Sequence, residues 1–237
     1  MTRRATVVML PGLLCDDAVW ATQEQALADA DCIVPDYGST SSISAMARQV
    51  LAEVHDDRLR VVGHSMGGRV ALEMARLAPA RIERIALLDT GFHARAAGAA
   101  GEAEERERVA LLWLAREHSM REMGQRWARG MVHPERVGTP VFEQILDMIE
   151  RKTPALFEAQ IQALLGRPDA RPVLEALRCP TLLLCGRQDA WSPLARHEEM
   201  HAMLPASELV VVENAGHMTT MEQPDAVIAA LRNWMVA

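Results

Sequence analysis

The stretch that decides the fold of this chain is Leu59-Arg60-Val61-Val62-Gly63-His64-Ser65-Met66-Gly67-Gly68. A short apolar run leads into a G-x-S-x-G pattern, and an apolar segment with helical spacing follows. This order is typical of a sharp strand-to-helix turn that presents a serine above a sheet. The glycines leave room for the strained turn, and the first helical turn directs free N–H groups toward the serine. We therefore predict that Ser65 is a catalytic nucleophile; a glycine-rich turn that only packs a helix on a strand is the alternative.

Short apolar runs recur along the chain and predict the strands of one sheet. They lie at 6–10, 32–34, 59–62, 85–88, 181–185 and 209–212. Segments with helical spacing, such as 44–54, lie between most of them. Strands that alternate with helices are typical of an α/β fold with a doubly wound, mostly parallel sheet. We expect a sheet of about six strands.

The interval between 88 and 181 breaks this alternation. It has no convincing strand and contains four helix-like segments, at 102–118, 119–131, 140–151 and 154–166, with prolines as breaks. We predict that 92–167 is a helical cap inserted into a core formed by 1–91 and 168–237. Trp113 and Trp127 are candidates for lining a substrate pocket under this cap, and plain packing within the cap is the alternative.

A serine hydroxyl needs a base and an acid that orients the base. Asp189 follows the apolar run at 181–185, and His217 follows the run at 209–212. Open α/β sheets place their functional residues after the carboxyl ends of strands. We predict that Ser65, Asp189 and His217 act together.

Two further polar residues need an interpretation. Asp89 ends the run at 85–88 and is the alternative acid, although a strand-ending turn also explains Asp89-Thr90-Gly91. His64 precedes the nucleophile, and we expect it to support the loop and not to take the serine proton.

Three segments carry a resemblance to a known family. Gly-His-Ser-Met-Gly-Gly at 63–68, Gly-Arg-Gln-Asp at 186–189 and Asn-Ala-Gly-His-Met at 214–218 resemble motifs of the α/β-hydrolase superfamily, with its chain order of Ser, Asp and His. In motif style the chain is most similar to small bacterial carboxylesterases and enol-lactonases. The resemblance implies a six-strand version of the fold that lacks the family's first strands.

The resemblance also identifies an oxyanion loop after the first strand. This loop is Leu10-Pro11-Gly12-Leu13-Leu14-Cys15-Asp16, in which Pro11 stands where the family often has histidine. The backbone N–H groups of Leu13 and Met66 are the implied oxyanion donors, a role that needs amides and no particular side chain. An ordinary turn at Pro11-Gly12 is the alternative.

These residues predict a cofactor-independent serine hydrolase that cleaves a small to medium-sized carboxylic ester, lactone or thioester through an acyl-enzyme on Ser65. The same triad can serve perhydrolysis, acyl transfer or carbon–carbon hydrolysis. A ligand-binding member of the fold with low turnover is an alternative from another class. A serine at 65, where an aspartate would be needed, argues against haloalkane dehalogenase or epoxide hydrolase chemistry.

The composition excludes several classes of protein and of partner. With 237 residues, 49% of them hydrophobic and 24% charged, the chain has room for one α/β domain with a full core. A formal net charge of -7 argues against nucleic acid as a partner. No apolar stretch approaches membrane length, and the run at 5–10 is too short for a signal peptide. We expect a cytoplasmic protein with a small-molecule substrate and no membrane partner.

The histidines and the four cysteines have no shared metal-ligand spacing, so we expect no metal site. Buried thiols are the simplest interpretation of the cysteines. Cys15 lies in the oxyanion loop and is therefore a candidate reactive thiol.

Overall fold

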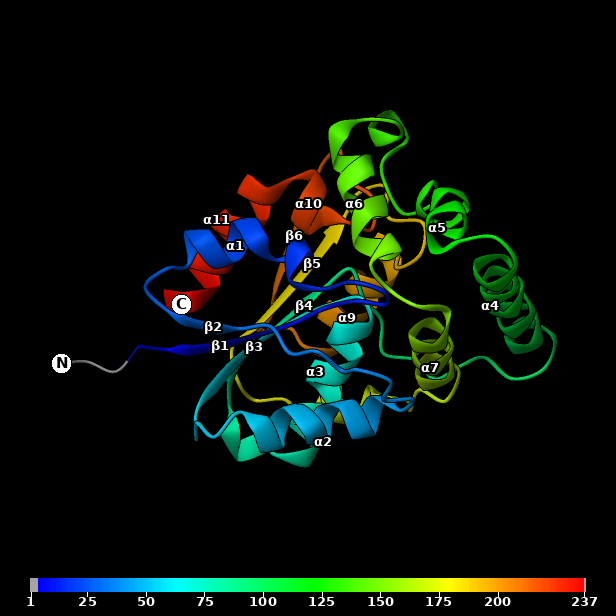
Figure 1. The fold of residues 1–237 in the computed structure, drawn as a ribbon. Helices are drawn as coiled ribbons and strands as arrows, with labels where there is room; N and C mark the ends of the chain where they lie inside the picture. The colour runs from blue at the N-terminus through cyan, green and yellow to red at the C-terminus, as the bar shows by residue number, and fades with distance from the viewer. Residues whose placement is uncertain (1–3, 237) are drawn as a thin grey trace.

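Six parallel strands form the sheet at the centre of the molecule (Figure 1). The computed structural model of the chain describes residues 4–236. Within them the strands are β1 (Thr6–Leu10), β2 (Asp31–Ile33), β3 (Leu59–His64), β4 (Ile82–Leu88), β5 (Thr181–Gly186) and β6 (Glu208–Val212). Their order is β2-β1-β3-β4-β5-β6, and each neighbouring pair is parallel. The predicted six-strand α/β fold is confirmed.

Helices cover both faces of the sheet. Helices α2 and α3 pack together on one face, and α1 and α11 pack together on the other (Figure 1). Outside residues 92–167 the helices are α1 (Ala21–Ala26), α2 (Ile43–Glu53), α3 (Met66–Leu77), α8 (Arg171–Ala176), α9 (Leu194–Met203), α10 (Thr219–Glu222) and α11 (Pro224–Val236), with 3₁₀ turns at Asp17–Val19 and Pro79–Arg81. This layering makes the sheet doubly wound.

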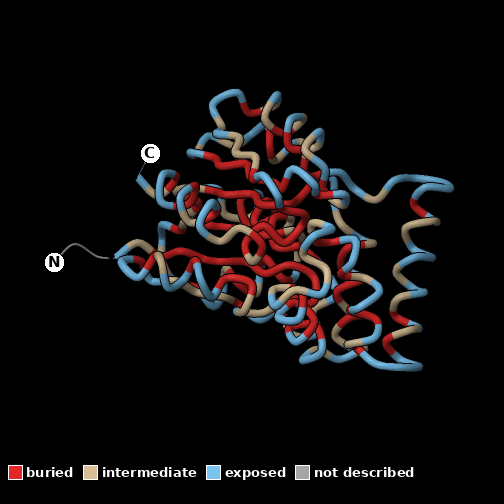
Figure 2. Tube along the Cα trace, turned by 90° about the horizontal axis from the view of Figure 1, so that it is seen from above, coloured by how far each residue is buried: buried red, intermediate tan, exposed pale blue. Residues whose placement is uncertain are grey.

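The buried residues concentrate around the sheet, as Figure 2 shows. Strands β3 and β4 are buried along most of their length. A parallel sheet covered on both faces buries both sides of its strands, which explains the continuous apolar runs in the sequence. Each fully buried valine or leucine contributes about 1.5–3 kcal/mol of transfer free energy. The sheet is therefore a firm base for the loops at its carboxyl edge.

The interval between β4 and β5 is helical, in agreement with the sequence. It contains α4 (Ala99–Glu117), α5 (Met120–Ala128), a 3₁₀ turn (Pro134–Arg136), α6 (Pro140–Glu150) and α7 (Pro154–Leu165). Pro140 and Pro154 occupy first-turn positions, where a missing N–H costs nothing, and Ser119 caps α5 by accepting from the N–H of Glu122 at 3.0 Å.

In Figure 1 these four helices lie above and to the right of the sheet. Most residues of α4 are exposed (Figure 2). Helix α4 packs on α5 and α7, and α5 packs on α6. We call this set of helices the cap; its domain limits, 92–167, stay a prediction. Among the described residues, no helix combines the length and the apolar content needed to cross a bilayer.

Candidate active site

Ser65 lies at the junction of β3 and α3 in a strained backbone conformation, with φ 54° and ψ -115°. The turn is possible because the neighbouring glycines have no side chain. A Cβ on Gly63 would lie 2.4 Å from the carbonyl oxygen of Gly67, and one on Gly67 would lie 2.1 Å from that of Leu10. The Ser65 hydroxyl is thereby raised above the carboxyl edge of the sheet, as the G-x-S-x-G pattern predicts.

Ser65, His217 and Asp189 form a hydrogen-bonded chain. His217 Nε2 lies 2.8 Å from Ser65 Oγ, and His217 Nδ1 lies 2.8 Å from Asp189 Oδ2. A carboxylate accepts hydrogen bonds and donates none, so the Nδ1 proton faces Asp189 and leaves Nε2 as an acceptor toward the serine. The structure thus brings together the three residues that the sequence singles out.

Asp189 is held as a charged, oriented acid. Its Oδ1 accepts from the backbone N–H groups of Trp191 and Ser192, both at 2.8 Å. Burial by itself raises the pKa of Asp189, but His217 and these two N–H groups outweigh burial and bring the pKa below its ordinary value. Both oxygens are therefore committed, one to the backbone and one to His217.

The alternative acid, Asp89, has other partners. Its Oδ1 accepts from the N–H of Gly186 at 3.0 Å, and its Oδ2 accepts from the Thr219 hydroxyl. Burial and the nearby charge of Asp189 raise its pKa well above the ordinary value. Asp89 makes no hydrogen bond to His217 within residues 4–236.

His64 supports the loop that carries His217. Its Nε2 lies 2.8 Å from the carbonyl oxygen of His217, and the side chain is completely buried. Burial, reinforced by the charge of His217, lowers the pKa of His64 to about 3. His64 is therefore neutral, and Nε2–H donates to the loop backbone.

The predicted oxyanion loop, residues 10–16, lies directly against Ser65. A Cβ on Gly12 would lie 3.2 Å from Ser65 Cβ and 2.9 Å from His64 Nδ1, so only glycine fits there. The Leu13 amide has no hydrogen-bond acceptor among the described residues, and the amide of Met66, in the first turn of α3, has none inside the helix. Leu13, Met66 and Ser65 line one pocket.

The cap fixes this loop by contacts that the sequence does not reveal. The N–H of Leu14, a residue with positive φ (60°), donates to Gln160 Oε1 on α7 at 2.8 Å. Asp16 forms ion pairs with Arg151 at 2.9 Å and with Lys152 at 3.1 Å, between α6 and α7. The predicted oxyanion loop is thus held from the cap side as well as from the sheet.

Glu222 anchors the backbone on both sides of His217. Its Oε1 accepts from the N–H groups of Gly216 at 3.0 Å and Met218 at 3.1 Å, and its Oε2 accepts from the N–H of His133 at 2.7 Å. One buried carboxylate therefore ties both neighbours of His217 to the segment that links α5 and α6.

The pocket over Ser65 has a volume of about 400 Å³. Its apolar wall is partly aromatic: the ring of Trp191 lies 5.4 Å from that of His217 and 5.0 Å from that of Trp127, between centroids. Other lining residues are Leu111, Met131 and Leu164, together with the charged residues Arg69, Glu104, Glu107, Arg108, Arg167 and Arg196.

The two tryptophans predicted for the pocket have different positions. Trp127 lines it, whereas Trp113 is 59% exposed, lies on the outer part of α4 and is not among the lining residues. The expectation for Trp113 is corrected: α4 buries Leu112 and Ala115, and the next position along the helix turns outward.

Cys15 lies in the pocket wall as expected, but as a protonated thiol. Burial, followed by the charge of Asp16, raises its pKa to about 12. The thiolate is the reactive form of cysteine, and a thiol with so high a pKa forms little of it. The structure therefore does not support the prediction that Cys15 is reactive. Among the described residues no three His, Cys, Asp or Glu side chains are grouped as metal ligands.

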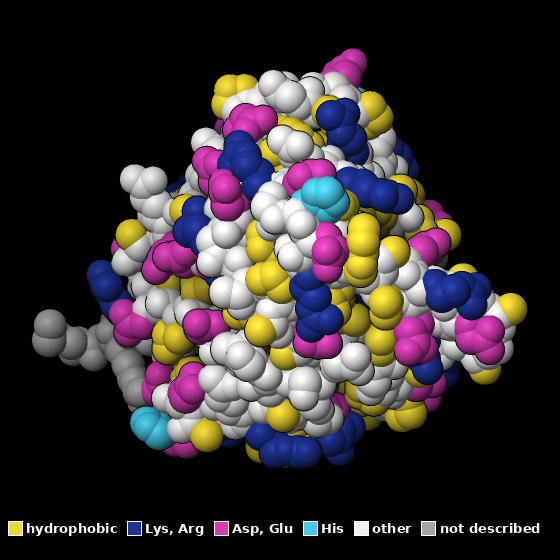
Figure 3. Space-filling view, turned by 45° about the vertical axis from the view of Figure 1, so that its right-hand side comes forward, with side chains coloured by type: hydrophobic (Ala, Val, Ile, Leu, Met, Phe, Trp, Pro, Cys, Tyr) yellow, Lys and Arg dark blue, Asp and Glu magenta, His cyan; other side chains and the backbone are white. Residues whose placement is uncertain are grey.

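Charged side chains of both signs are interspersed over the face shown in Figure 3, and the basic groups there form no continuous field. This observation agrees with the composition, and the expected lack of a nucleic-acid partner stays a prediction.

The comparison with known proteins gives the family. The profile of the Alpha/beta hydrolase family matches residues 7–230, so the chain belongs to this family. The pimeloyl-[acyl-carrier protein] methyl ester esterase of Neisseria meningitidis is 28% identical over 202 residues, covering 84% of this chain and 77% of that protein. The putative carbamate hydrolase RutD of Escherichia coli is 24% identical over 223 residues, covering 87% and 76%.

Solved structures agree with this assignment. A thermophilic esterase from Thermogutta terrifontis, with malate bound, matches with a TM-score of 0.87 and 29% identity, covering 98% of this chain and 89% of that one. The enol-lactonase of Burkholderia xenovorans matches with a TM-score of 0.86 and 20% identity, covering 99% and 92%. The relatives named here are hydrolases, two of them esterases, and the predicted resemblance to the α/β-hydrolase superfamily is confirmed.

Proposed function

We propose that this protein is a cofactor-independent serine hydrolase that cleaves a carboxylic ester, or a lactone or thioester, through an acyl-enzyme on Ser65. The observation that carries the proposal is the continuous chain Ser65 Oγ, His217, Asp189, with both links at 2.8 Å. The esterase activity named for two relatives supports the same reaction class.

In the first half of the reaction, Ser65 Oγ attacks the carbonyl carbon while His217 Nε2 takes its proton. Asp189 stabilises the imidazolium that forms, and the Leu13 and Met66 amides donate to the negative oxygen of the tetrahedral intermediate. His217 then gives the proton to the leaving alcohol or thiol. Ser65 remains acylated.

In the second half, water attacks the acyl-enzyme, and His217 takes a proton from the water and returns it to Ser65 Oγ. The carboxylic acid leaves, and the free enzyme is restored. Trp191 and Trp127 form the apolar wall beside His217 and limit the water that reaches the imidazole.

The proposal is tested with para-nitrophenyl esters, a lactone and an acyl thioester under steady-state conditions. We expect many turnovers per protein on at least one of them, an initial burst of para-nitrophenol equal to the protein concentration when deacylation is slow, and loss of both in Ser65→Ala. A wild-type protein that binds these compounds and releases no product would indicate the ligand-binding alternative. Turnover by Ser65→Ala at the wild-type rate would exclude the acyl-enzyme on Ser65.

A further inference from the structure

Two arginines of the active-site pocket have no acidic partner within the part of the chain that the structure describes. Arg108 and Arg167 share Glu104: Arg108 donates to Oε1 at 2.9 Å, and Arg167 donates to both oxygens at 2.7 and 2.8 Å. Arg69 and Arg196 differ from this pair. Neither has an Asp or Glu oxygen within 4.0 Å among residues 4–236.

The hydrogen bonds of these two arginines go to backbone carbonyl groups. Arg69 Nη1 donates to the carbonyl of His93 at 2.8 Å, and Arg196 Nη1 donates to that of Trp191 at 3.2 Å. A guanidinium has five N–H donors, so most of the donors on each side chain are left for another acceptor. Carbonyl groups orient the two cations, but they carry no full negative charge that would neutralise them.

The surroundings of Arg69 make its positive charge costly to hold. Burial, followed by the charges of Arg167 and Arg196, lowers the pKa of Arg69 to about 9. The protein as a whole carries a formal net charge of -7, so general basicity does not account for cations in this pocket. Glu104 is occupied by two other arginines, and Glu107 is exposed. An anion in the pocket would relieve the repulsion among these arginines.

Both arginines lie near the nucleophile. Arg69 is one turn after Ser65 on α3, about 6 Å further along the helix axis. Arg196 packs beside Gly91, where an added Cβ would lie 2.4 Å from Arg196 Cδ, and the preceding Thr90 donates to the Ser65 carbonyl oxygen at 2.6 Å. Arg69 and Arg196 line the same pocket as Ser65 and His217.

We propose that Arg69 and Arg196 bind an anionic oxygen group of the substrate, a carboxylate or a phosphate, a few bonds from the carbonyl that Ser65 attacks. Guanidinium groups bind such groups through paired N–H donors. This inference rests on the proposed function and narrows it: the preferred substrate is an ester, lactone or thioester that carries an acid.

A matched set of para-nitrophenyl esters tests the proposal. One ester ends in a carboxylate (the glutarate half-ester), one ends in a phosphonate, and one has a neutral branched end of the same shape as the carboxylate. We expect wild-type kcat/KM to be at least tenfold higher for one of the anionic esters than for the neutral one. Which anionic ester is preferred separates a carboxylate from a phosphate site.

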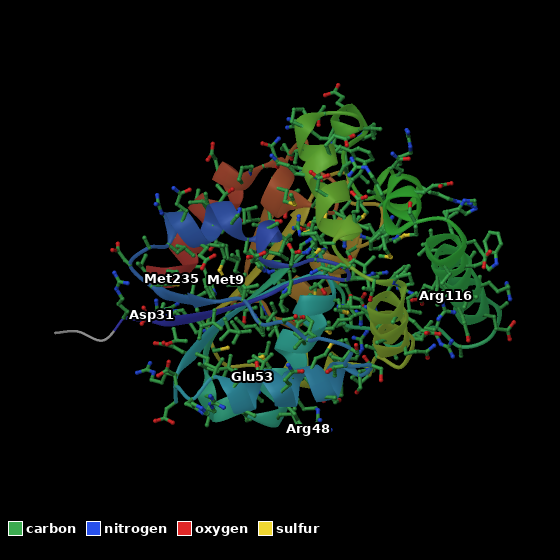
Figure 4. All side chains as sticks on the ribbon, in the orientation of Figure 1. Met9, Asp31, Arg48, Glu53, Arg116 and Met235 are labelled. Carbon is green, nitrogen blue, oxygen red and sulfur yellow. The ribbon has the colours of Figure 1, made fainter. Side chains whose placement is uncertain are left out.

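The variants assign this preference to residues. Arg69→Met and Arg196→Met should each lower the ratio of kcat/KM for the anionic ester to that for the neutral ester by about 10- to 100-fold. Arg69→Lys should keep part of the preference. Arg116→Gln is the matched control: it removes an exposed arginine of α4 that pairs with Glu158 and lies far from the sheet (Figure 4), and the ratio should not change.

A wild-type preference for the neutral ester, or a ratio that neither methionine variant changes, would overturn the proposal. If wild type hydrolyses none of the esters, the proposed function is wrong, and calorimetric titration with glutarate and with inorganic phosphate decides about the anion site. Binding of either anion that is lost in Arg196→Met supports the site. No binding of either anion to wild type overturns it.

Discussion

Replacing Asp189 by asparagine should leave the active-site geometry nearly intact and remove most of the activity. The carboxylate accepts from the N–H groups of Trp191 and Ser192 through Oδ1 and faces His217 Nδ1 through Oδ2, 2.8 Å away. Asparagine can meet the two backbone donors only with its carbonyl oxygen, so its NH₂ group turns to Nδ1. The histidine proton then moves to Nε2 and faces Ser65, where a base is needed.

The size of the loss follows from this wrong tautomer. In protease triads the corresponding change costs about 10⁴ in kcat, or about 5.4 kcal/mol of activation free energy. We expect Asp189→Asn to lower kcat by about 10² to 10⁴, with the smaller loss if a neighbouring carboxylate substitutes.

Asp89→Asn is the matched control. Asp89 is also buried and also follows a strand, but its oxygens accept from Gly186 and Thr219. This variant should keep kcat within about tenfold. Both variants are measured on one good ester, with thermal melts to verify that each is folded. If Asp89→Asn lost most of its kcat while Asp189→Asn kept nearly all of it, the assignment of Asp189 as the acid would be refuted.

Three further predictions follow from the contacts of the site. Glu222→Gln should lower kcat by about tenfold and the free energy of unfolding by about 1–3 kcal/mol, because three backbone N–H groups donate to this carboxylate. Unchanged kcat and unchanged thermal melting would contradict this prediction. Trp127→Ala should change the ranking of acyl-chain lengths, whereas the exposed Trp113→Ala should not, and equal effects of the two would contradict the corrected pocket. The thiol of Cys15, with its pKa raised to about 12, stays protonated below that pH, so labelling of the native protein by iodoacetamide at pH 8 should spare it; rapid labelling at Cys15 would oppose this.

The core of the site could be predicted because its signals are local. A serine in a strained turn needs small neighbours at fixed positions, and Gly63 and Gly67 stand beside Ser65 in the sequence itself. Asp189 and His217 each follow a recognisable apolar strand, and parallel strands bring their carboxyl ends to one edge. Local patterns and strand order therefore indicate these three residues from the sequence alone.

The supporting contacts could not be predicted because they join distant segments. Gln160 reaches Leu14 across 146 residues, and Glu222 reaches His133 across 89. No periodicity marks a side chain that meets a backbone N–H on another element. No sequence pattern singles out Arg69, and its lack of an acidic partner among residues 4–236 is visible only in three dimensions.

Trp113 shows the limit of helical patterns. Apolar residues surround it at 111, 112 and 114, and the pattern alone did not decide which of them face the cap interior. The packing of α4 on α5 and α7 decides this, because only one side of α4 is covered.

The most direct test of the central claim is covalent trapping of the nucleophile. The wild-type protein is treated with a fluorophosphonate and the label is located by peptide mapping, with Ser65→Ala treated in parallel. We expect one adduct per chain, on Ser65, and no adduct in Ser65→Ala, because among the described residues a base and two free amides converge on that hydroxyl alone. A label on Ser192 or Ser119 with Ser65 unmodified would contradict it.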